Sequence, residues 1–335
     1  MSETPDSDAV SGSSVPTGPT ADVRPLPSDE ATDLIHDVIE NVESVIVGNT
    51  DGIEHVLTAV LGRGHVLLED VPGVGKTKLA RSIARSIAGE FRRIQFTPDL
   101  LPTDVTGVNV FNEKTREFDF RPGPVFGNVV LADEIDRAPP KTQSALLEAM
   151  EERQVTTDGE TRALPDPFVV IATQNTIERE RTYDLPVAEL DRFTKRVSLG
   201  YPDADEEKVI LERTVGGDPL DAIDAVTTVE QVRRARATAA AITVSDPIRD
   251  YVTRLSRFTR DRAALGASPR ASIALLRACQ GRAVLAGRDY VIPDDVKAEA
   301  VPVLAHRIRA GSSDAVGSPS SRELVETALE RVPPE

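Results

Sequence analysis

The residues with the clearest chemical potential lie in a glycine-rich segment that ends in Gly73-Val-Gly-Lys-Thr77. The order of residue types predicts a strand, a loop and a helix start, so that loop N–H groups and the helix dipole face phosphate oxygens. Lys76 can then reach the β- and γ-phosphates of a nucleotide, and the Thr77 hydroxyl can bind Mg²⁺. We expect Pro72, Gly73, Val74, Gly75 and Lys78 to complete this nucleotide site. The usual pattern begins with glycine where this chain has Asp70, whose carboxylate would have to point away from the phosphates.

A second set of polar residues follows an apolar stretch at residues 129–132. Asp133 and Glu134 stand where a buried strand should end, at the edge of a parallel sheet that commonly holds ligands. Asp133 suits Mg²⁺, and Glu134 suits polarising the water that attacks a γ-phosphate. Asp136 and Arg137 follow directly, and the residues leave open whether they join the site or form a surface ion pair.

The elements that position these residues alternate between strands and helices. Alternation of this kind predicts a parallel sheet with right-handed crossovers, a P-loop NTPase αβα sandwich. We expect strands at 65–68, 91–96, 129–132, 168–173 and 195–199, and helices at 31–45, 51–61, 76–88 and 141–152. Two hairpins are expected, at 108–111 with 117–121 and at 155–157 with 161–164, the latter around an Asp158-Gly159 turn.

The pattern changes after Tyr201-Pro202, and only helical periodicity follows. Helices are predicted at 206–213, 229–241, 247–260, 268–286, 294–310 and 321–331. Residues 1–28 are rich in Ser, Pro, Thr and Asp, and residues 1–30 hold six acidic residues against one basic residue. We therefore expect a disordered acidic tail at 1–28, a nucleotide-binding core at 29–201 and an all-helical domain at 202–335.

Composition bounds the cellular context of the chain. Of 335 residues, 55 are acidic and 39 are basic, which gives a net charge of −16, and seven of the basic residues are lysines. This acidic, lysine-poor balance favours a halophilic protein, whose self-repulsion is screened by salt, over an ordinary acidic one. No secretory signal or bilayer-length apolar run is apparent, so we expect a cytoplasmic protein without a membrane span. One cysteine excludes an internal disulfide, and the four histidines lack metal-ligand spacing.

Several long motifs together resemble the MoxR family of AAA+ ATPases, in the group with an insert in helix 2. They lie at 69–77, 99–107, 121–126, 127–155 (which contains Asp133-Glu-Ile-Asp-Arg137) and 266–270, and the similarity spans 45–308. The resemblance implies that ATP and Mg²⁺ bind between the core and the helical lid, with Val47 and Gly48 beside the adenine. The insert, near 99–121, would project toward the pore of a ring.

The same resemblance implies roles for three further residues. Asn175 matches the sensor that helps to orient the attacking water. Arg192 matches the arginine finger that reaches the nucleotide of a neighbouring subunit. Arg270 matches the lid arginine that contacts the γ-phosphate within its own subunit.

The implied function is a ring-forming remodelling or chaperone-like ATPase, usually a hexamer, that acts on protein clients with a partner containing a von Willebrand A-like domain. One alternative is a nucleic-acid motor, which should carry a basic, aromatic-rich insert hairpin. Residues 108–121 carry three basic and three acidic side chains, so nucleic acid is disfavoured. Another alternative is a P-loop kinase or GTPase switch. A GTPase should show an Asn/Thr-Lys-x-Asp motif, which the sequence lacks, and a kinase would not need a finger from another subunit.

Overall fold

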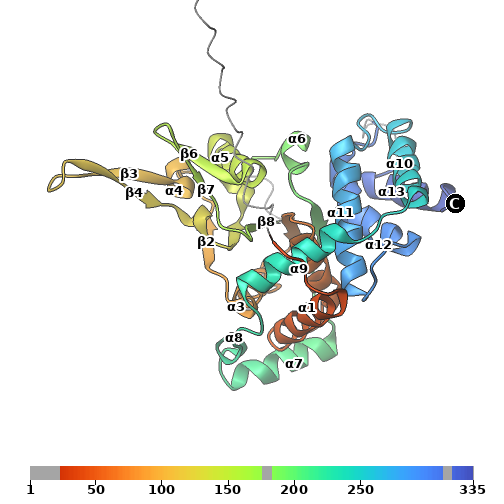
Figure 1. Ribbon diagram of the computed structural model, residues 1–335, viewed down its shortest axis with the longest axis horizontal. Helices are drawn as coiled ribbons and strands as arrows, with labels where there is room; N and C mark the ends of the chain where they lie inside the picture. Colours follow the sequence, from red (N-terminus) through yellow and green to blue (C-terminus); the bar gives the residue numbers. More distant parts are fainter. Residues whose placement is uncertain (1–22, 176–182, 312–318, 335) are drawn as a thin grey trace, which may run out of the picture.

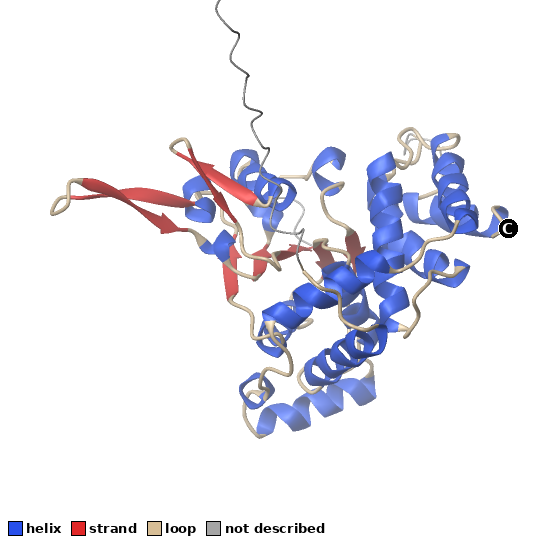
Figure 2. Cartoon of the chain, viewed as in Figure 1, coloured by secondary structure: helices blue, strands red, loops and turns tan. Residues whose placement is uncertain are grey.

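A five-stranded parallel sheet lies at the centre of the computed structural model, which describes residues 23–175, 183–311 and 319–334 (Figure 2). The strands are β1 (Val66–Asp70), β2 (Phe91–Gln95), β5 (Val129–Asp133), β8 (Val169–Asn175) and β9 (Lys195–Val197). Their order is β2-β5-β8-β1-β9, and each neighbouring pair is parallel. The predicted α/β class with a parallel sheet is therefore confirmed.

Side chains along the strands point alternately to two apolar layers, as the twofold period of a strand requires. Leu68 and Leu131 belong to one buried cluster, and Leu67 and Val130 belong to the other. Helices α1 (Ser28–Glu43), α2 (Thr50–Leu61) and α3 (Lys76–Ser86) cover the first layer, and α5 (Pro140–Glu152) covers the second. The sheet is thus enclosed between helices, and only its edges can present polar groups to a ligand.

Two hairpins extend from the core, both close to their expected positions. The first follows the short helix α4 (Pro102–Thr106) and pairs β3 (Gly107–Asn112) with β4 (Glu117–Pro122). It projects away from the sheet (Figure 1) and exposes Phe111 and Phe118, whose ring centroids are 5.3 Å apart. The second pairs β6 (Gln154–Thr157) with β7 (Glu160–Ala163). Its turn residues Asp158 and Gly159 both have positive φ, which explains the turn chemistry at that point.

The described residues after 201 form helices and two isolated bridges, but no strand. The helices are α7 (Ala204–Val215), α8 (Pro219–Ala222), α9 (Val229–Ala241), α10 (Asp246–Arg260), α11 (Pro269–Leu285), α12 (Pro293–Leu304) and α13 (Ser321–Arg331). The short helix α6 (Val187–Leu190) precedes β9. Within the described residues, no helix has both the length and the apolarity needed to cross a membrane.

Two expected boundaries differ from the structure. The helix predicted at 294–310 ends at Leu304, because the side chains of His306 and Arg307 turn back to the Phe193 carbonyl, at 3.0 and 2.7 Å. The tail predicted at 1–28 lies largely outside the described residues. Leu26 is buried, however, and its carbonyl accepts a 2.8 Å hydrogen bond from Thr238, so the packed part of the chain begins before α1.

A buried ion pair joins the sheet to the C-terminal helices. Lys195 in β9 lies 2.6 Å from Glu299 in α12, and both side chains are fully buried. Burial opposes ionisation of Glu299, yet the Lys195 ammonium lowers the pKa of that carboxyl to about 2. Because a buried charge without its partner is costly, this pair fixes α12 against the end of the sheet.

Candidate nucleotide-binding site

The phosphate loop has the strand, loop and helix order that the sequence predicts. β1 ends at Asp70, and α3 begins at Lys76. Gly73 and Gly75 have φ values of +89° and +91°, a backbone region that side chains rarely tolerate. A Cβ at Gly73 would meet nothing within 4 Å, so the backbone angle rather than crowding calls for glycine there. The loop therefore curls as a phosphate cradle must.

Asp70 occupies the first position of the motif without backbone strain. It is the last residue of β1 and does not have positive φ, so a glycine is not needed. Its carboxylate accepts hydrogen bonds from Leu199 and Gly200, far along the chain, and from the adjacent Val71 N–H.

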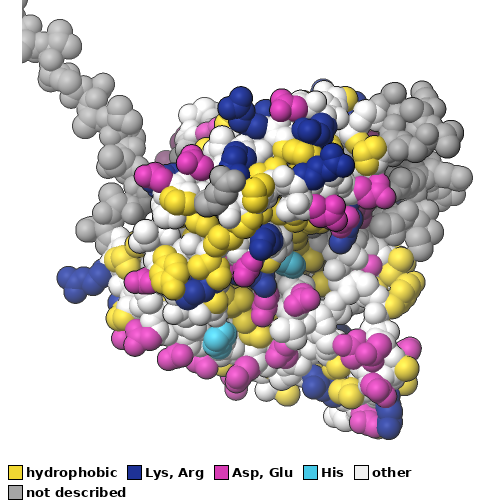
Figure 3. All heavy atoms as spheres, turned by 90° about the vertical axis from the view of Figure 1, so that its right-hand side faces the viewer, with side chains coloured by type: hydrophobic (Ala, Val, Ile, Leu, Met, Phe, Trp, Pro, Cys, Tyr) yellow, Lys and Arg dark blue, Asp and Glu magenta, His cyan; other side chains and the backbone are white. Residues whose placement is uncertain are grey.

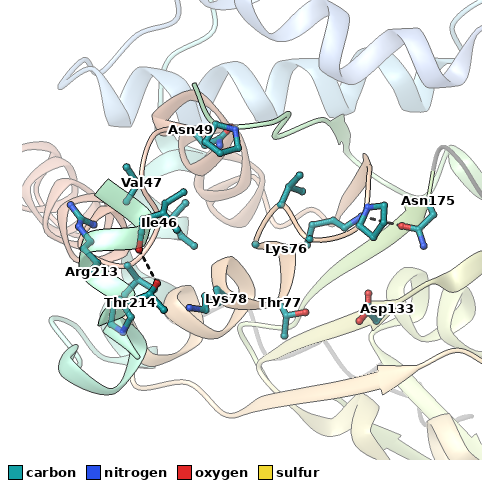
Figure 4. A pocket seen from close by; sticks show the side chains of 18 of the residues that line it. Ile46, Val47, Asn49, Lys76, Thr77, Lys78, Asp133, Asn175, Arg213 and Thr214 are labelled. Carbon is teal, nitrogen blue, oxygen red and sulfur yellow. Dashed lines mark hydrogen bonds between the residues drawn. The ribbon is translucent and has the colours of Figure 1, made fainter. Parts of the chain in front are cut away.

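Lys76 lies at the centre of the site. Its ammonium donates to the Asp70 carbonyl at 3.1 Å and to the Asn175 side chain at 3.4 Å (Figure 4). Burial lowers the pKa of Lys76, and the carboxylates of Asp70, Asp133 and Glu134 oppose that shift. The residue is thus a positive charge held by polar groups at the sheet edge.

The C-terminal ends of β5 and β8 come together, as their parallel register requires. Asp133 accepts a 2.7 Å hydrogen bond from Thr173, and Asn175 donates to Glu134 at 3.0 Å. Glu134 has φ +56°, a left-handed conformation at the point where the chain leaves β5. Asp133 and Thr77 lie on facing sides of the pocket in Figure 4, where both could bind one Mg²⁺.

Two polar residues that sequence reasoning missed, Arg93 and Gln95, contact the acidic pair together with Arg137, whose role the sequence left open. Arg93 lies 2.6 Å from Asp133, Gln95 donates to Glu134 at 2.8 Å, and Arg137 donates to Glu134 at 2.8 Å. Arg93 and Gln95 belong to β2, whose Gln95 is the register partner of Asp133. The signal was available, because two polar residues stand near the end of a strand that should flank β5.

Asp136 and Arg137 do not form the surface pair that the sequence left open. Arg137 pairs with Glu134, and Asp136 is buried. Burial, and then the nearby Glu134 charge, raise the pKa of Asp136 to about 6 against the effect of its backbone hydrogen bond. Both residues are therefore part of the site's surroundings.

The other end of the pocket is apolar and suits a base. The pocket has a volume of about 470 Å³, and its lining away from the acids includes Val47, Asn49, Ile210 and Thr214. Pro72, Val74 and Lys78 line it as predicted, although Lys78 also pairs with Asp218 at 3.2 Å. Gly48 does not line it. Gly48 has φ +68°, a left-handed conformation that favours glycine, and a Cβ there would also meet the flexible Glu206 side chain of α7 at 2.2 Å. Helix α7 lines the pocket with Ile210, Arg213 and Thr214, and α8 adds Pro219.

The structure does not bring Arg192 and Arg270 to this pocket. Both contact Glu151 of α5, Arg192 at 3.4 Å, and both line a second pocket of about 420 Å³. In this structure Arg270, in the first turn of α11, lies beside Glu151 of α5 and does not line the nucleotide pocket; its predicted contact with phosphates of its own subunit stays a prediction.

The second pocket is rich in arginine, which the sequence did not predict. We call it the arginine pocket; its charged lining residues are Arg63, Arg153, Arg192, Arg270, Arg277, Arg307, Glu151 and Asp191. Burial lowers the pKa of Arg153, and the nearby Arg63 charge lowers it further. The pocket thus holds an excess of positive charge.

Comparison with known proteins agrees with this geometry. Residues 65–195 match the family described as ATPase family associated with various cellular activities (AAA), and residues 256–328 match the AAA lid domain. Protein YeaC of Bacillus subtilis is 50% identical over 82% of this chain and 87% of its own length. Chaperone MoxR1 of Mycobacterium tuberculosis is 44% identical over 86% of this chain and 78% of its own length. A crystal structure of a Cytophaga hutchinsonii protein is 37% identical with a TM-score of 0.85, over 91% of this chain and 96% of that one. This chain belongs to the MoxR family of AAA ATPases.

Proposed function

We propose that this protein binds ATP with Mg²⁺ at the phosphate loop and hydrolyses it to ADP and phosphate. The observation that carries the proposal is the convergence of Lys76, Asp133, Glu134 and Asn175 at one edge of the sheet, beside a loop with two positive-φ glycines. This pocket supplies a cation for phosphates, oxygen ligands for a metal and a carboxylate for water.

Each residue has a distinct role in this proposal. Lys76 and the loop N–H groups bind the β- and γ-phosphates, and Thr77 and Asp133 hold Mg²⁺, which neutralises charge on the phosphate oxygens. Glu134 accepts a proton from the water that attacks the γ-phosphorus, while the bond to the ADP oxygen breaks. Asn175, which donates to Glu134 at 3.0 Å, orients that carboxylate and the water.

We propose further that copies assemble into a ring, with six subunits as the family resemblance implies. Arg192 and Arg270 share Glu151 in the arginine pocket and do not line the nucleotide pocket. Arginine guanidinium groups suit developing charge on a transferring phosphoryl group. We therefore assign Arg192 to the nucleotide of a neighbouring subunit, and the contact of Arg270 with phosphates of its own subunit stays a prediction.

The ring would act on protein clients, together with a partner that contains a von Willebrand A-like domain. The relative MoxR1 is named a chaperone. The β3–β4 hairpin supports a protein contact, because it projects from the core and exposes the Phe111 and Phe118 rings. Exposed aromatic side chains are common at protein interfaces.

The test is turnover of MgATP by the purified chain and by Glu134→Gln. The wild type should release phosphate, and Glu134→Gln should bind ATP with nearly unchanged affinity but lose turnover, because only the proton acceptor is removed. Glu113→Gln, an exposed carboxylate on the insert hairpin, is the matched control and should hydrolyse ATP normally. Wild-type binding without turnover, or normal turnover by Glu134→Gln, would contradict the proposal.

A further inference from the structure

Asp70, the residue that departs from the phosphate-loop motif, is a buried carboxylate with partners far along the chain. One of its oxygens accepts from the Leu199 N–H at 2.6 Å, the Gly200 N–H at 2.8 Å and the Ser198 hydroxyl at 3.2 Å. The other accepts from the adjacent Val71 N–H at 2.9 Å. Hydrogen bonds from N–H groups to a carboxylate are among the stronger hydrogen bonds in proteins. Asp70 therefore ties the start of the loop firmly to residues 198–200.

Residues 198–200 connect the last strand of the sheet to α7. β9 ends at Val197, and α7 begins at Ala204. Helix α7 lines the nucleotide pocket with Ile210, Arg213 and Thr214 (Figure 4). The place where the connecting segment is anchored therefore decides where α7 lies over the pocket.

Few contacts other than this tie hold α7. Of its described residues, 204–215, none is buried, and Leu211 and Val215 are exposed. Arg213 donates to the carbonyls of Glu43 and Ser44 at 2.8 and 2.7 Å, and Glu206 approaches Gly48. Because no side chain of α7 is fully buried, although Val209 and Ile210 are half-buried, its position depends largely on polar contacts of this kind.

Asp70 also contacts the residue that would bind phosphate. Its carbonyl accepts the 3.1 Å hydrogen bond from Lys76. The main-chain carbonyl of Asp70 thus contacts Lys76, which would bind phosphate, and its side chain contacts the segment that leads to α7. Glycine, the usual residue at this position, could make only the first of these contacts.

We propose that Asp70 is a positioning residue that links the phosphate loop to α7, so that nucleotide bound at Lys76 determines how α7 covers the pocket. The inference rests on the proposed nucleotide site. It predicts that loss of the carboxylate frees α7 without removing any group that touches phosphate.

The experiment compares Asp70→Gly, Asp70→Asn and Ser198→Ala with the full-length wild type by hydrogen exchange, with and without a non-hydrolysable ATP analogue. Without nucleotide, amides at 198–203 should exchange about tenfold faster or more in Asp70→Gly, since two N–H groups lose a charged acceptor. The exchange rate of these amides in Asp70→Asn should lie between those in the wild type and in Asp70→Gly, because asparagine keeps one acceptor oxygen. Ser198→Ala should resemble the wild type, since it removes only the 3.2 Å hydroxyl contact.

The analogue should slow exchange at 204–215 in the wild type and leave these amides fast in Asp70→Gly. Steady-state turnover should show a raised KM with kcat within about threefold, whereas a merely structural defect would lower the active fraction at unchanged KM. Equal exchange and equal nucleotide response in Asp70→Gly and wild type would overturn the proposal. If Asp70→Gly does not fold, Asp70→Asn decides the matter on the same measurements.

The design separates this inference from the proposed function. If the wild type does not bind the analogue, the nucleotide site itself is wrong, and the nucleotide-free comparison still tests the tie between Asp70 and residues 198–200. If the wild type binds the analogue and α7 responds without Asp70, only the positioning role is wrong.

Discussion

The nucleotide pocket and the arginine pocket differ in charge and in origin. The first brings Lys76 together with carboxylates at the edge of the sheet, and Lys76, Thr77, Asp133 and Glu134 come from two contiguous motifs. The second holds six arginines against two carboxylates and draws them from the loop after α2, the end of α5, the segment before β9, α11 and the turn after α12. In the proposed reaction the two pockets would supply different parts: the first would position phosphate, metal and water, and the second would offer arginines.

Because both pockets occur in one chain, two copies could complete each other. The proposal of a ring depends on this complementarity. Substitutions in the nucleotide pocket should therefore affect ATP affinity and turnover differently from substitutions in the arginine pocket.

Lys76→Ala should cause the largest loss in the nucleotide pocket. ATP affinity should fall roughly 100-fold, because a charged donor to the phosphates disappears. Binding of a fluorescent ATP analogue measures the effect, and Lys141→Ala, an exposed lysine of α5, is the matched control. Unchanged affinity in Lys76→Ala would show that this pocket does not hold the phosphates.

Arg192→Ala should instead lose turnover and keep ATP affinity. Arginine fingers contribute roughly 10³–10⁵ in rate in GTPases, and we expect a smaller loss here. A mixture of Lys76→Ala and Arg192→Ala subunits should recover part of the phosphate release, and the recovery should grow with total protein concentration.

Arg196→Ala is the comparison variant for this test, since Arg196 lies in the same segment but pairs with Glu69 at 3.3 Å. If Arg196→Ala rather than Arg192→Ala loses turnover, the finger is Arg196. If the two variants co-assemble but the mixture releases no phosphate, the two pockets do not act on the same nucleotide, and the proposed site between subunits is contradicted.

Low pH should destabilise the fold through His65, which lines the arginine pocket. Burial, and then the Arg153 charge, lower the pKa of His65 to about 3, and its Nδ1 accepts from the Val170 N–H at 2.9 Å. Because the pKa of His65 in the fold lies below the usual 6.5, the unfolded chain binds a proton first as the pH falls. The unfolding free energy is therefore undiminished above about pH 6.5 and decreases as the pH falls toward about 3.

This loss amounts to about 2 kcal/mol at pH 5. The unfolding free energy measured in urea at pH 7.5 and pH 5 should fall less in His65→Gln than in the wild type. If the unfolding free energy falls by the same amount in His65→Gln and in the wild type, His65 is not a source of acid sensitivity.

Salt should have the smallest effect, a rise of a few degrees in the thermal midpoint between 0.1 and 1 M KCl. The chain has a net charge of −16, and the face in Figure 3 carries many Asp and Glu side chains, with Lys and Arg gathered near its top. Over this range the Debye length shrinks from about 10 Å to about 3 Å, which screens repulsion. A flat or falling midpoint would contradict the halophilic interpretation.

The sequence by itself determined the features whose chemistry lies in contiguous residues. The glycine loop at 71–75, the start of α3 at Lys76 and the acidic end of β5 follow from local residue order, because backbone angle and strand position are set over a few residues. Alternating strands and helices likewise predicted the parallel sheet, since buried strands and amphipathic helices have distinct periods.

Only the tertiary structure decided which distant residues meet. The sequence could require that the Asp70 carboxylate turn away from phosphate, but not that it would reach Leu199 and Gly200. It could assign Arg270 to a phosphate, but not place that residue beside Glu151. The physical reason is that helix packing over long sequence separations fixes where side chains of α11 or of the segment before α7 lie, and this packing leaves no mark in local residue order.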